Sequence, residues 1–438
     1  MKICKRLLLS SFLTASLLTA SACTGTGGSN ETAPSRIKEQ NTNREPVEIT
    51  FYRPNTGTTE EQFMDLMGKK IKEKFPFVTP KFIPFGTGTS VNEVIASGQP
   101  LDIVILSIGF VPQFHNLNLS TDLDELIKKH NYDTNRLETT TFDFVKQFGN
   151  GKVTFLPIFT TAHTLMYNKD IFDRFGVPYP TEGMTWDDIY ELSKKLSRTD
   201  GGTKYYGFLT SVGHMMRTNQ LALSFVDPKT QQPLTGSEKF KQVVENFARF
   251  YNMPGSELPK EKYGKEADMF LKERTLAMYA YFNSTMVSAP ADLNLEAVQL
   301  PSFKEAPGVG SQMYPTFASV SSTSKNKDVA FEILAYLTSD EMQTKFAKDA
   351  LGMPIVKNSS NIMESFGADI ATLKGKNLKG FYPVKPAAIA PKTIYDDLAE
   401  KHLTTAFREY AQGASDVNTA LRKAVESAVK DIEAAKQK

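Results

Sequence analysis

The sequence contains little cysteine, tryptophan or histidine, and each shortage argues against a class of site. Of 438 residues, two are cysteine and one is tryptophan. Both cysteines, Cys4 and Cys23, lie near the start of the chain, so a disulfide framework is excluded. The five histidines include no pair at the i, i+3 or i, i+4 spacing of a metal site, which argues against bound zinc.

Charge excess and common catalytic motifs are also missing. A formal net charge of +2 gives no electrostatic reason to expect a nucleic-acid partner. No Gly-x-Ser-x-Gly elbow occurs, and the glycine run from Gly86 to Ser90 lacks the Lys-Ser/Thr of a phosphate-binding loop. We therefore expect neither a metal nor a cofactor. With 438 residues and 40% hydrophobic content, the chain suits a globular protein with two lobes.

The N-terminal segment predicts export. Residues 2–18 begin with basic side chains and continue as an apolar run that is too short for a stable membrane anchor. The segment before Cys23 resembles a bacterial lipobox, with Ala20 where leucine is usual. Cys4 would leave with a signal peptide over residues 1–22, so the remaining Cys23 has no internal partner, and lipidation is its predicted use. The polar residues 23–45 are expected to form a flexible tether.

The next hundred residues alternate between strand and helix patterns. Strands are predicted over Val47 to Tyr52, Val78 to Pro84 and Leu101 to Leu106, with helices starting near Glu60 and Ser90. The unbroken apolar run LDIVIL is typical of a central parallel strand that is buried on both faces. This order predicts a doubly wound α/β lobe, whose ligands bind at the carboxyl ends of the strands.

A second lobe is predicted from Leu165 to Leu196 onward. In this stretch Asn168 and Gly176 should cap one helix, and Thr185 with Asp188 should form the capping box of the next. Further strands are predicted over Val153 to Phe159, Tyr206 to Thr210, Thr275 to Phe282 and Phe317 to Ser321, and further helices over His214 to Phe225, Phe240 to Tyr251, Asp328 to Leu337 and Ser339 to Ala350. A last helix should bury one face, formed by Val417, Leu421, Ala424, Ala428 and Ile432.

The amino-acid sequence from Leu165 to Leu196 resembles a segment of the extracellular solute-binding proteins of family 1. These are carbohydrate-type binding lipoproteins that serve ABC importers. Four more segments resemble elements of the family in the same order, namely Ser97 to Val104, Ala318 to Leu337, Gly352 to Pro354 and Ala411 to Val417. The resemblance implies a binding protein rather than an enzyme, with two doubly wound lobes of the periplasmic-binding-protein type II.

The resemblance also implies boundaries, partners and a location. The expected parts are lobe 1 (46–156 and 316–356), lobe 2 (160–300 and 360–438) and hinge crossings (157–159, 301–315 and 357–359). The expected partners are a carbohydrate solute and the permease subunits of an ABC importer. A monomer is expected on the outer face of the cytoplasmic membrane, as in a Gram-positive type of bacterium.

The ligand loops of the family match thirteen residues here. They are Asn55, Thr56, Gly57, Ser107, Phe110, Phe159, Thr160, Thr161, His214, Tyr281, Phe282, Asn283 and Met353. Sugar-binding members often carry tryptophan after the third strand and after the strand that ends at Phe282, whereas the single tryptophan here, Trp186, belongs to the helical scaffold. Phe159, Tyr281 and Phe282 could still stack on a sugar.

Two other functions remain open at this point. A glycoside hydrolase would need two carboxylates facing one bond, and the adjacent acidic pairs such as Asp187/Asp188 are poor candidates. A lipoprotein used for sensing or adhesion would share the same lobes, so the sequence does not separate it from an importer component.

Overall fold

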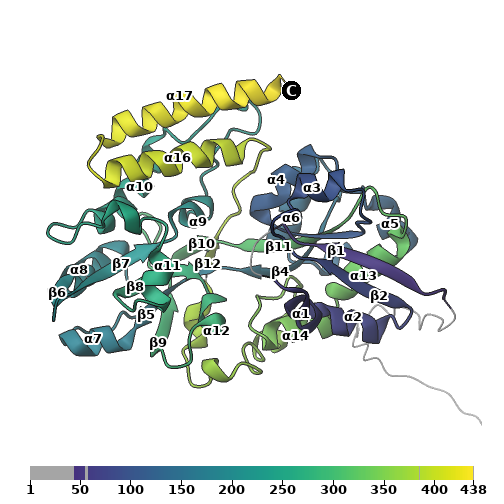
Figure 1. Ribbon diagram of the computed structural model, residues 1–438, viewed down its shortest axis with the longest axis horizontal. Coiled ribbons are helices and arrows are strands. Elements are labelled where there is room, and N and C mark those ends of the chain that lie inside the picture. Colours follow the sequence, from purple (N-terminus) through teal and green to yellow (C-terminus); the bar gives the residue numbers. More distant parts are fainter. Residues whose placement is uncertain (1–43, 55–57, 384, 438) are drawn as a thin grey trace, which may run out of the picture. The chain divides into compact units, whose positions relative to one another are not determined.

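The computed structural model describes residues 44–54, 58–383 and 385–437. The predicted signal peptide, Cys23 and nearly all of the tether lie outside the described residues. Within these ranges the chain forms a mixed α/β fold with two five-stranded sheets and one two-stranded sheet (Figure 1). None of the helices described there has the length and apolar character needed to cross a membrane.

The first sheet has the order β2-β1-β3-β11-β4. Strand β1 pairs in parallel with β2 and β3, whereas β11 is antiparallel to β3 and β4. The predicted central strand is confirmed, because β3 is buried along its length up to a partly buried Ser107. The strands are β1 (Val47–Tyr52), β2 (Val78–Ile83), β3 (Ile103–Ser107), β4 (Leu156–Thr161) and β11 (Tyr314–Val320).

The second sheet has the order β6-β7-β8-β5-β9. Strands β7 and β8 are parallel, and β5 is antiparallel to both of its neighbours. A separate pair, β10 and β12, is parallel. The strands are β5 (His163–Asn168), β6 (Arg198–Asp200), β7 (Thr203–Thr210), β8 (Leu276–Phe282), β9 (Leu295–Gln299), β10 (Val309–Gln312) and β12 (Lys385–Ala387).

The chain first passes from one sheet to the other at Ala162. Strand β4 of the first sheet ends at Thr161, and β5 of the second sheet starts at His163. Residues 157–159, which were expected to form a crossing, therefore lie within β4. A short β10 fills part of the expected crossing 301–315, and the chain re-enters the first sheet at Tyr314.

Helices cover both five-stranded sheets. In the first part, α1 and α2 pack against β2, and α13 and α14 pack against β4. A short π-helix (Met64–Gly68) joins α1 to α2, and Phe63, Met67 and Ile71 are buried as their four-residue spacing predicts. The helices of this part are α1 (Glu60–Phe63), α2 (Lys69–Lys74), α3 (Val91–Ala96), α4 (Val111–Asn116), α5 (Asp124–Lys129), α6 (Thr139–Phe148), α13 (Lys327–Leu337) and α14 (Asp340–Lys348).

The other helices include a C-terminal pair, α16 and α17, which lie side by side at the top of Figure 1. Helix α17 buries the five predicted side chains and Ala420. The bounds are α7 (Lys169–Phe175), α8 (Trp186–Leu196), α9 (Val212–Arg217), α10 (Glu238–Tyr251), α11 (Glu266–Leu271), α12 (Thr285–Ser288), α15 (Ser360–Met363), α16 (Asp396–Ala411) and α17 (Val417–Lys436). Single 3₁₀ turns occupy Ile108–Phe110, Thr134–Arg136, Lys260–Lys262, Ala371–Leu373 and Leu378–Phe381.

The predicted caps of α7 and α8 are confirmed. The Asn168 side chain accepts a hydrogen bond from the backbone N–H of Asp170, and Gly176 ends α7 with a φ of 62°. Thr185 and Asp188 form the reciprocal capping box of α8. These local contacts fix the ends of both helices against the second sheet.

The predicted helix from His214 to Phe225 is wrong beyond Arg217, where α9 ends. The Asn219 amide donates to the carbonyls of Met216 and Leu223, and its oxygen accepts the Leu223 N–H. Ala222 adopts a φ of 53°. A side chain that bonds its own backbone competes with the helical ladder, and here this interaction replaces the helix.

Candidate functional site

Aromatic side chains from both five-stranded sheets meet in one cluster. Tyr281 and Phe282 end β8, His214 lies in α9, and Tyr314 begins β11. The His214 ring centroid lies 5.1 Å from that of Tyr281 and 5.2 Å from that of Phe282. Phe282 in turn lies 4.7 Å from Tyr314. These are edge-to-face and tilted arrangements at ordinary aromatic distances, so the cluster joins the two sheets directly.

Polar groups surround this aromatic cluster. Arg217 Nη1 donates to the Tyr314 hydroxyl at 3.0 Å, and Ser107 Oγ lies 3.3 Å from the same oxygen. Arg217 also donates to both Glu400 oxygens, at 2.7 and 2.8 Å. A Cβ atom at Gly109 would lie 2.4 Å from Arg217 Nη1 and 2.8 Å from the Tyr314 hydroxyl, so a larger residue there would displace the ends of both side chains.

The ionisable groups of the cluster are arranged so that its imidazoles stay neutral. Burial and the Arg217 charge lower the pKa of His214 to about 4. Burial and His214 lower the pKa of His163, which packs 4.6 Å from Phe282, to about 3. Burial opposes the charge on Arg217, but Tyr314 and Glu400 outweigh it and raise the pKa of the guanidinium. The one strong cation is thus already paired with a carboxylate.

Some of the predicted site residues meet in this cluster, and others lie elsewhere in the fold. Ser107, His214, Tyr281 and Phe282 are brought together, whereas Asn55, Thr56 and Gly57 lie outside the described residues. Phe159 is buried in the core against Phe346, 5.5 Å between centroids. The buried Asn283 donates from its amide to the Phe381 carbonyl.

Three further predicted residues, Thr160, Thr161 and Met353, make hydrogen bonds within the fold. Thr160 and Met353 exchange two backbone hydrogen bonds, at 3.0 and 2.7 Å. Thr161 Oγ1 donates to the Tyr314 carbonyl at 3.3 Å. Phe110, at the end of a 3₁₀ turn after β3, is partly exposed. Their roles in solute binding remain predictions.

Sequence reasoning missed Arg217, Tyr314 and Glu400. Arg217 follows His214 by three residues, so both project from one face of α9, and this spacing could have pointed to it. No local pattern marks Tyr314 or Glu400, because only the fold brings them beside α9. Among the described residues, no group of three or more acidic, histidine or cysteine side chains could hold a metal ion.

A family model described as bacterial extracellular solute-binding protein matches residues 56–344 of the chain. The chain belongs to this family. This assignment confirms the resemblance of the sequence motifs and the expectation of a binding protein rather than an enzyme.

Solved structures of such proteins share the fold. The solute-binding protein is similar to the ABC substrate-binding protein Lmo0181 from Listeria monocytogenes in complex with cycloalternan (TM-score 0.71, 18% identity, covering 89% of this chain and 100% of that chain). It is also similar to an ABC transporter solute-binding protein from Thermotoga lettingae bound with α-D-tagatose (TM-score 0.67, 18% identity, 87% and 99% coverage). A third is the cyclic α-maltosyl-1,6-maltose binding protein from Arthrobacter globiformis (TM-score 0.66, 16% identity, 88% and 99% coverage). The mixed α/β fold of periplasmic-binding-protein type II is thereby confirmed.

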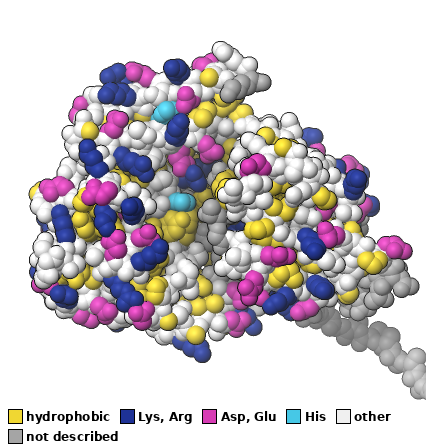
Figure 2. All heavy atoms as spheres, in the orientation of Figure 1, with side chains coloured by type: hydrophobic (Ala, Val, Ile, Leu, Met, Phe, Trp, Pro, Cys, Tyr) yellow, Lys and Arg dark blue, Asp and Glu magenta, His cyan; other side chains and the backbone are white. Residues whose placement is uncertain are grey.

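The solute-binding protein has a recess of about 270 Å³ beside the aromatic cluster. Its walls come from the start of α9, the end of β8, the segment before and into α11, and α16. The lining residues are Ser211, Val212, Gly213, Tyr263, Gly264, Glu266, Ala267, Tyr279, Tyr281, Thr404 and Arg408. Figure 2 shows a hollow on this face with one histidine among hydrophobic side chains and with acidic and basic side chains above them.

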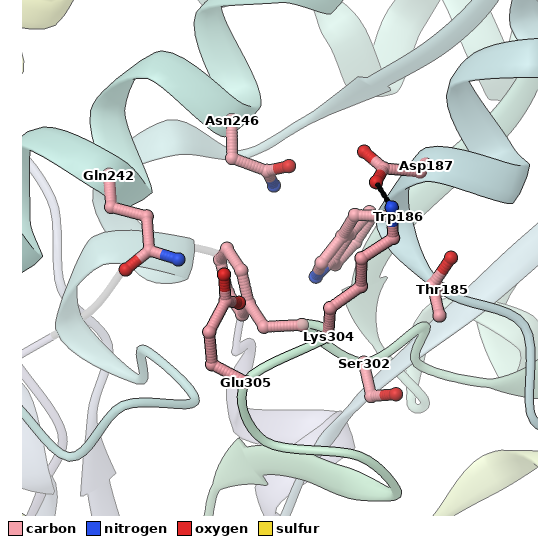
Figure 3. Close-up of a pocket in the computed structure, with 9 residues that line it drawn as sticks. Thr185, Trp186, Asp187, Gln242, Asn246, Ser302, Lys304 and Glu305 are labelled. Carbon is pink, nitrogen blue, oxygen red and sulfur yellow. Dashed lines mark ion pairs between the residues drawn. The ribbon is translucent and has the colours of Figure 1, made fainter.

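A second, smaller pocket of the solute-binding protein, of about 100 Å³, lies between α8, α10 and the 302–305 segment (Figure 3). Gln242 and Asn246 point into it from α10. Its Asp187 carboxylate is already paired, because Lys304 and Arg249 each contact one of its oxygens at 2.6 Å. Both helices pack on the second sheet, so this pocket does not join the two sheets.

Proposed function

We propose that this protein captures a sugar or oligosaccharide between two lobes and delivers it to an ABC importer. The observation that supports this proposal is the aromatic cluster of His214, Tyr281, Phe282 and Tyr314, which draws rings from both sheets. A sugar ring has apolar C–H faces that stack on aromatic side chains, and its hydroxyls need donors and acceptors.

Charge also favours a neutral, hydroxyl-rich solute. The two buried histidines are neutral at physiological pH, because burial lowers the pKa of each. Arg217 is paired with Glu400 through two hydrogen bonds, which leaves no net charge for an ionic solute. The sugars named for the structural relatives, among them cycloalternan and α-D-tagatose, support the same class.

In this proposal the lobes have the boundaries expected from the sequence. Lobe 1 comprises 46–156 and 316–356, and lobe 2 comprises 160–300 and 360–438, joined by hinges at 157–159, 301–315 and 357–359. The protein acts as a monomer and hands its solute to the permease subunits. The change of sheet at Ala162 supports a hinge next to the first of these segments.

The test is a binding screen of the mature protein by thermal shift, followed by calorimetry. The panel contains monosaccharides, linear oligosaccharides, amino acids and short peptides. We expect at least one saccharide to raise the melting temperature, since a ligand at 100 times its Kd stabilises the fold by about 2.7 kcal/mol. Stabilisation by peptides or amino acids alone would contradict the proposed solute class.

We also propose that a lipid on Cys23 anchors the protein at the outer face of the cytoplasmic membrane. Support comes from the basic and apolar segment before Cys23 and from the lack of any cysteine after it. The Cys23→Ala variant should be recovered in the medium, whereas the Cys4→Ala control should stay with the membranes. Retention of Cys23→Ala in membranes after a high-salt wash would argue against the anchor.

A further inference from the structure

The recess beside the aromatic cluster shares residues with it. Tyr281 lines the recess and also packs against His214, at 5.1 Å between ring centroids. Ser211 lines the recess, and its Oγ lies 2.8 Å from His214 Nδ1. The two spaces therefore have a common wall, and a solute longer than one ring could extend from the cluster into the recess.

The walls of the recess carry the groups that a sugar ring requires. Tyr263, Tyr279 and Tyr281 all line it, and the rings of Tyr279 and Tyr281 stack at 5.6 Å between centroids. Tyrosine presents a flat apolar face together with a hydroxyl, so the partly exposed Tyr263 and Tyr281 can cover a ring of C–H groups, whereas Tyr279 is 2% exposed and supports Tyr281 through their stacking. At about 270 Å³ the recess is close to the lower limit of the size range of small-molecule sites.

Two charged side chains of the recess have unused hydrogen-bonding capacity. Within the described residues, the Arg408 side chain makes no hydrogen bond or ion pair. Burial raises the pKa of the Glu266 carboxyl, and the nearby Arg408 charge opposes this shift only in part. Glu266 Oε1 accepts hydrogen bonds from the Gly264 N–H and the Tyr251 hydroxyl, whereas no partner of Oε2 occurs in that part of the chain. The Tyr263 hydroxyl is buried and also has no partner among these residues.

The tyrosines, Arg408 and Glu266 of the recess together favour a neutral ligand with several hydroxyls. One cation and one carboxylate that do not contact each other leave space between them, and a hydroxyl can accept from the first and donate to the second. An anionic ligand would meet the Glu266 carboxylate, and a cationic one would meet Arg408. A purely apolar ligand would leave both charged groups without partners.

We propose that the recess is a further saccharide subsite, and that the solute is therefore an oligosaccharide with one unit against Tyr281 and His214 and another beside Tyr279, Glu266 and Arg408. This inference rests on the proposed function. It adds that the protein discriminates by chain length, because a monosaccharide cannot occupy both spaces at once.

The experiment is calorimetric titration with three linear series of one to six units: α-1,4-linked glucose, β-1,4-linked glucose and β-1,4-linked mannose. In the series that binds, we expect affinity to rise at least tenfold from the shortest to the longest member. Arg408→Ala should weaken the longest member about tenfold and leave the shortest unchanged. Thr404→Phe, which narrows the recess from α16, should have the same length-dependent effect.

The matched control is Lys401→Ala, an exposed position on the same helix outside the recess. It should bind every length as the unchanged protein does. Equal affinity for all lengths, or an equal loss at all lengths in Arg408→Ala, would overturn the subsite while leaving the proposed function standing. Binding of no member of any series, in a protein that also fails the wider saccharide screen, would overturn both.

Discussion

At the scale of single residues, the most unusual group is the imidazole of His163. It is 1% exposed, and neither ring nitrogen has a hydrogen-bond partner within the described residues. Its ring packs against Phe282, and its backbone N–H donates to Ser311 Oγ at 3.1 Å. A protonated imidazole in this position would be a buried charge with no counter-ion, which explains why burial lowers its pKa to about 3.

His163 should make the stability of the protein depend on acid pH. The unfolded chain binds protons at about pH 6.5, whereas folded His163, with its pKa lowered to about 3, stays neutral. Above about pH 6.5 His163 therefore does not reduce the free energy of unfolding. As the pH falls from 6.5 towards 3, that free energy decreases by up to several kcal/mol, because only the unfolded chain binds the proton. His214 adds to the loss of stability, because burial and then the Arg217 charge lower its pKa to about 4. Urea unfolding at pH 7, 5.5 and 4.5 measures this slope.

The His163→Leu variant should have a flatter pH dependence and little loss of stability at pH 7, because it removes two buried nitrogens without partners. The same substitution at the exposed His115 controls for losing a histidine in general. If His163→Leu unfolds in acid with the same slope as the unchanged protein, His163 is not the group that titrates.

Tyr281 should contribute directly to solute affinity. It stands between the aromatic cluster and the recess and remains partly exposed, so its ring is available for stacking. Tyr281→Ala should weaken saccharide binding by about 1–3 kcal/mol through lost apolar contact and stacking. Tyr281→Phe should lose less. Calorimetry on folded variants measures both, and unchanged affinity in Tyr281→Ala would remove this residue from the site.

At the scale of elements, helix α8 shows how closely the second sheet is covered. It packs against β7, and Gly207 of β7 allows the contact, because a Cβ atom there would lie 2.4 Å from Ser193 Cα. Trp186 at the start of α8 is buried, and its indole N–H donates to Gln220 Oε1 at 2.8 Å. The helix is therefore held by its caps, by one glycine and by one buried hydrogen bond.

Gly207→Ala should destabilise the fold by about 1–3 kcal/mol, because the new methyl group forces α8 away from β7. The control is Gly86→Ala, where the nearest atom to an added Cβ lies 4.0 Å away. Urea unfolding of both variants gives the two free energies of unfolding. Equal stability of the two variants would show that α8 adjusts without cost.

Features of the fold that depend on residues close together in the sequence can be predicted from it, whereas features that depend on distant residues cannot. The caps of α7 and α8 and the buried face of α17 follow from spacing within one segment, and all were predicted correctly. The end of α9 was not, because Asn219 competes with the helix through its own side chain. Strands β10 and β12 pair across more than seventy residues, so nothing within either segment indicates them.

The candidate site shows the same division. Ser107, His214, Tyr281 and Phe282 were predicted because their segments match the ligand loops of the resembled family, and the structure brings the four together from two sheets and α9. Glu400 lies 183 residues from Arg217, and their pairing depends on the tertiary structure alone. An aromatic residue near a strand end can belong to the core instead of a ligand site. Phe159 is buried and packs against Phe346.

At the scale of the whole described chain, the two five-stranded sheets are connected by the polypeptide backbone and by side-chain contacts. The chain passes between the sheets at Ala162 and returns to the first sheet at Tyr314. Across this boundary, the Tyr314 hydroxyl accepts from Arg217 of α9 and lies 3.3 Å from Ser107 of β3. A short connection with a few polar contacts is the arrangement in which two lobes can change their separation at low cost.

The last prediction is that solute binding closes the two proposed lobes. Closed and open states should differ by only a few kcal/mol, so a ligand that contacts both lobes shifts the population by its differential affinity. Small-angle scattering should show a smaller radius of gyration with a bound saccharide. Tyr314→Phe, which removes the hydroxyl shared by Arg217 and Ser107, should enlarge the radius of the ligand-free protein. Tyr132→Phe, which loses a hydrogen bond to Thr338 within the first part of the fold, should leave that radius unchanged. A radius that stays constant on saturation would rule out closure, and an equal change in both variants would mean that the Tyr314 contact does not hold the lobes.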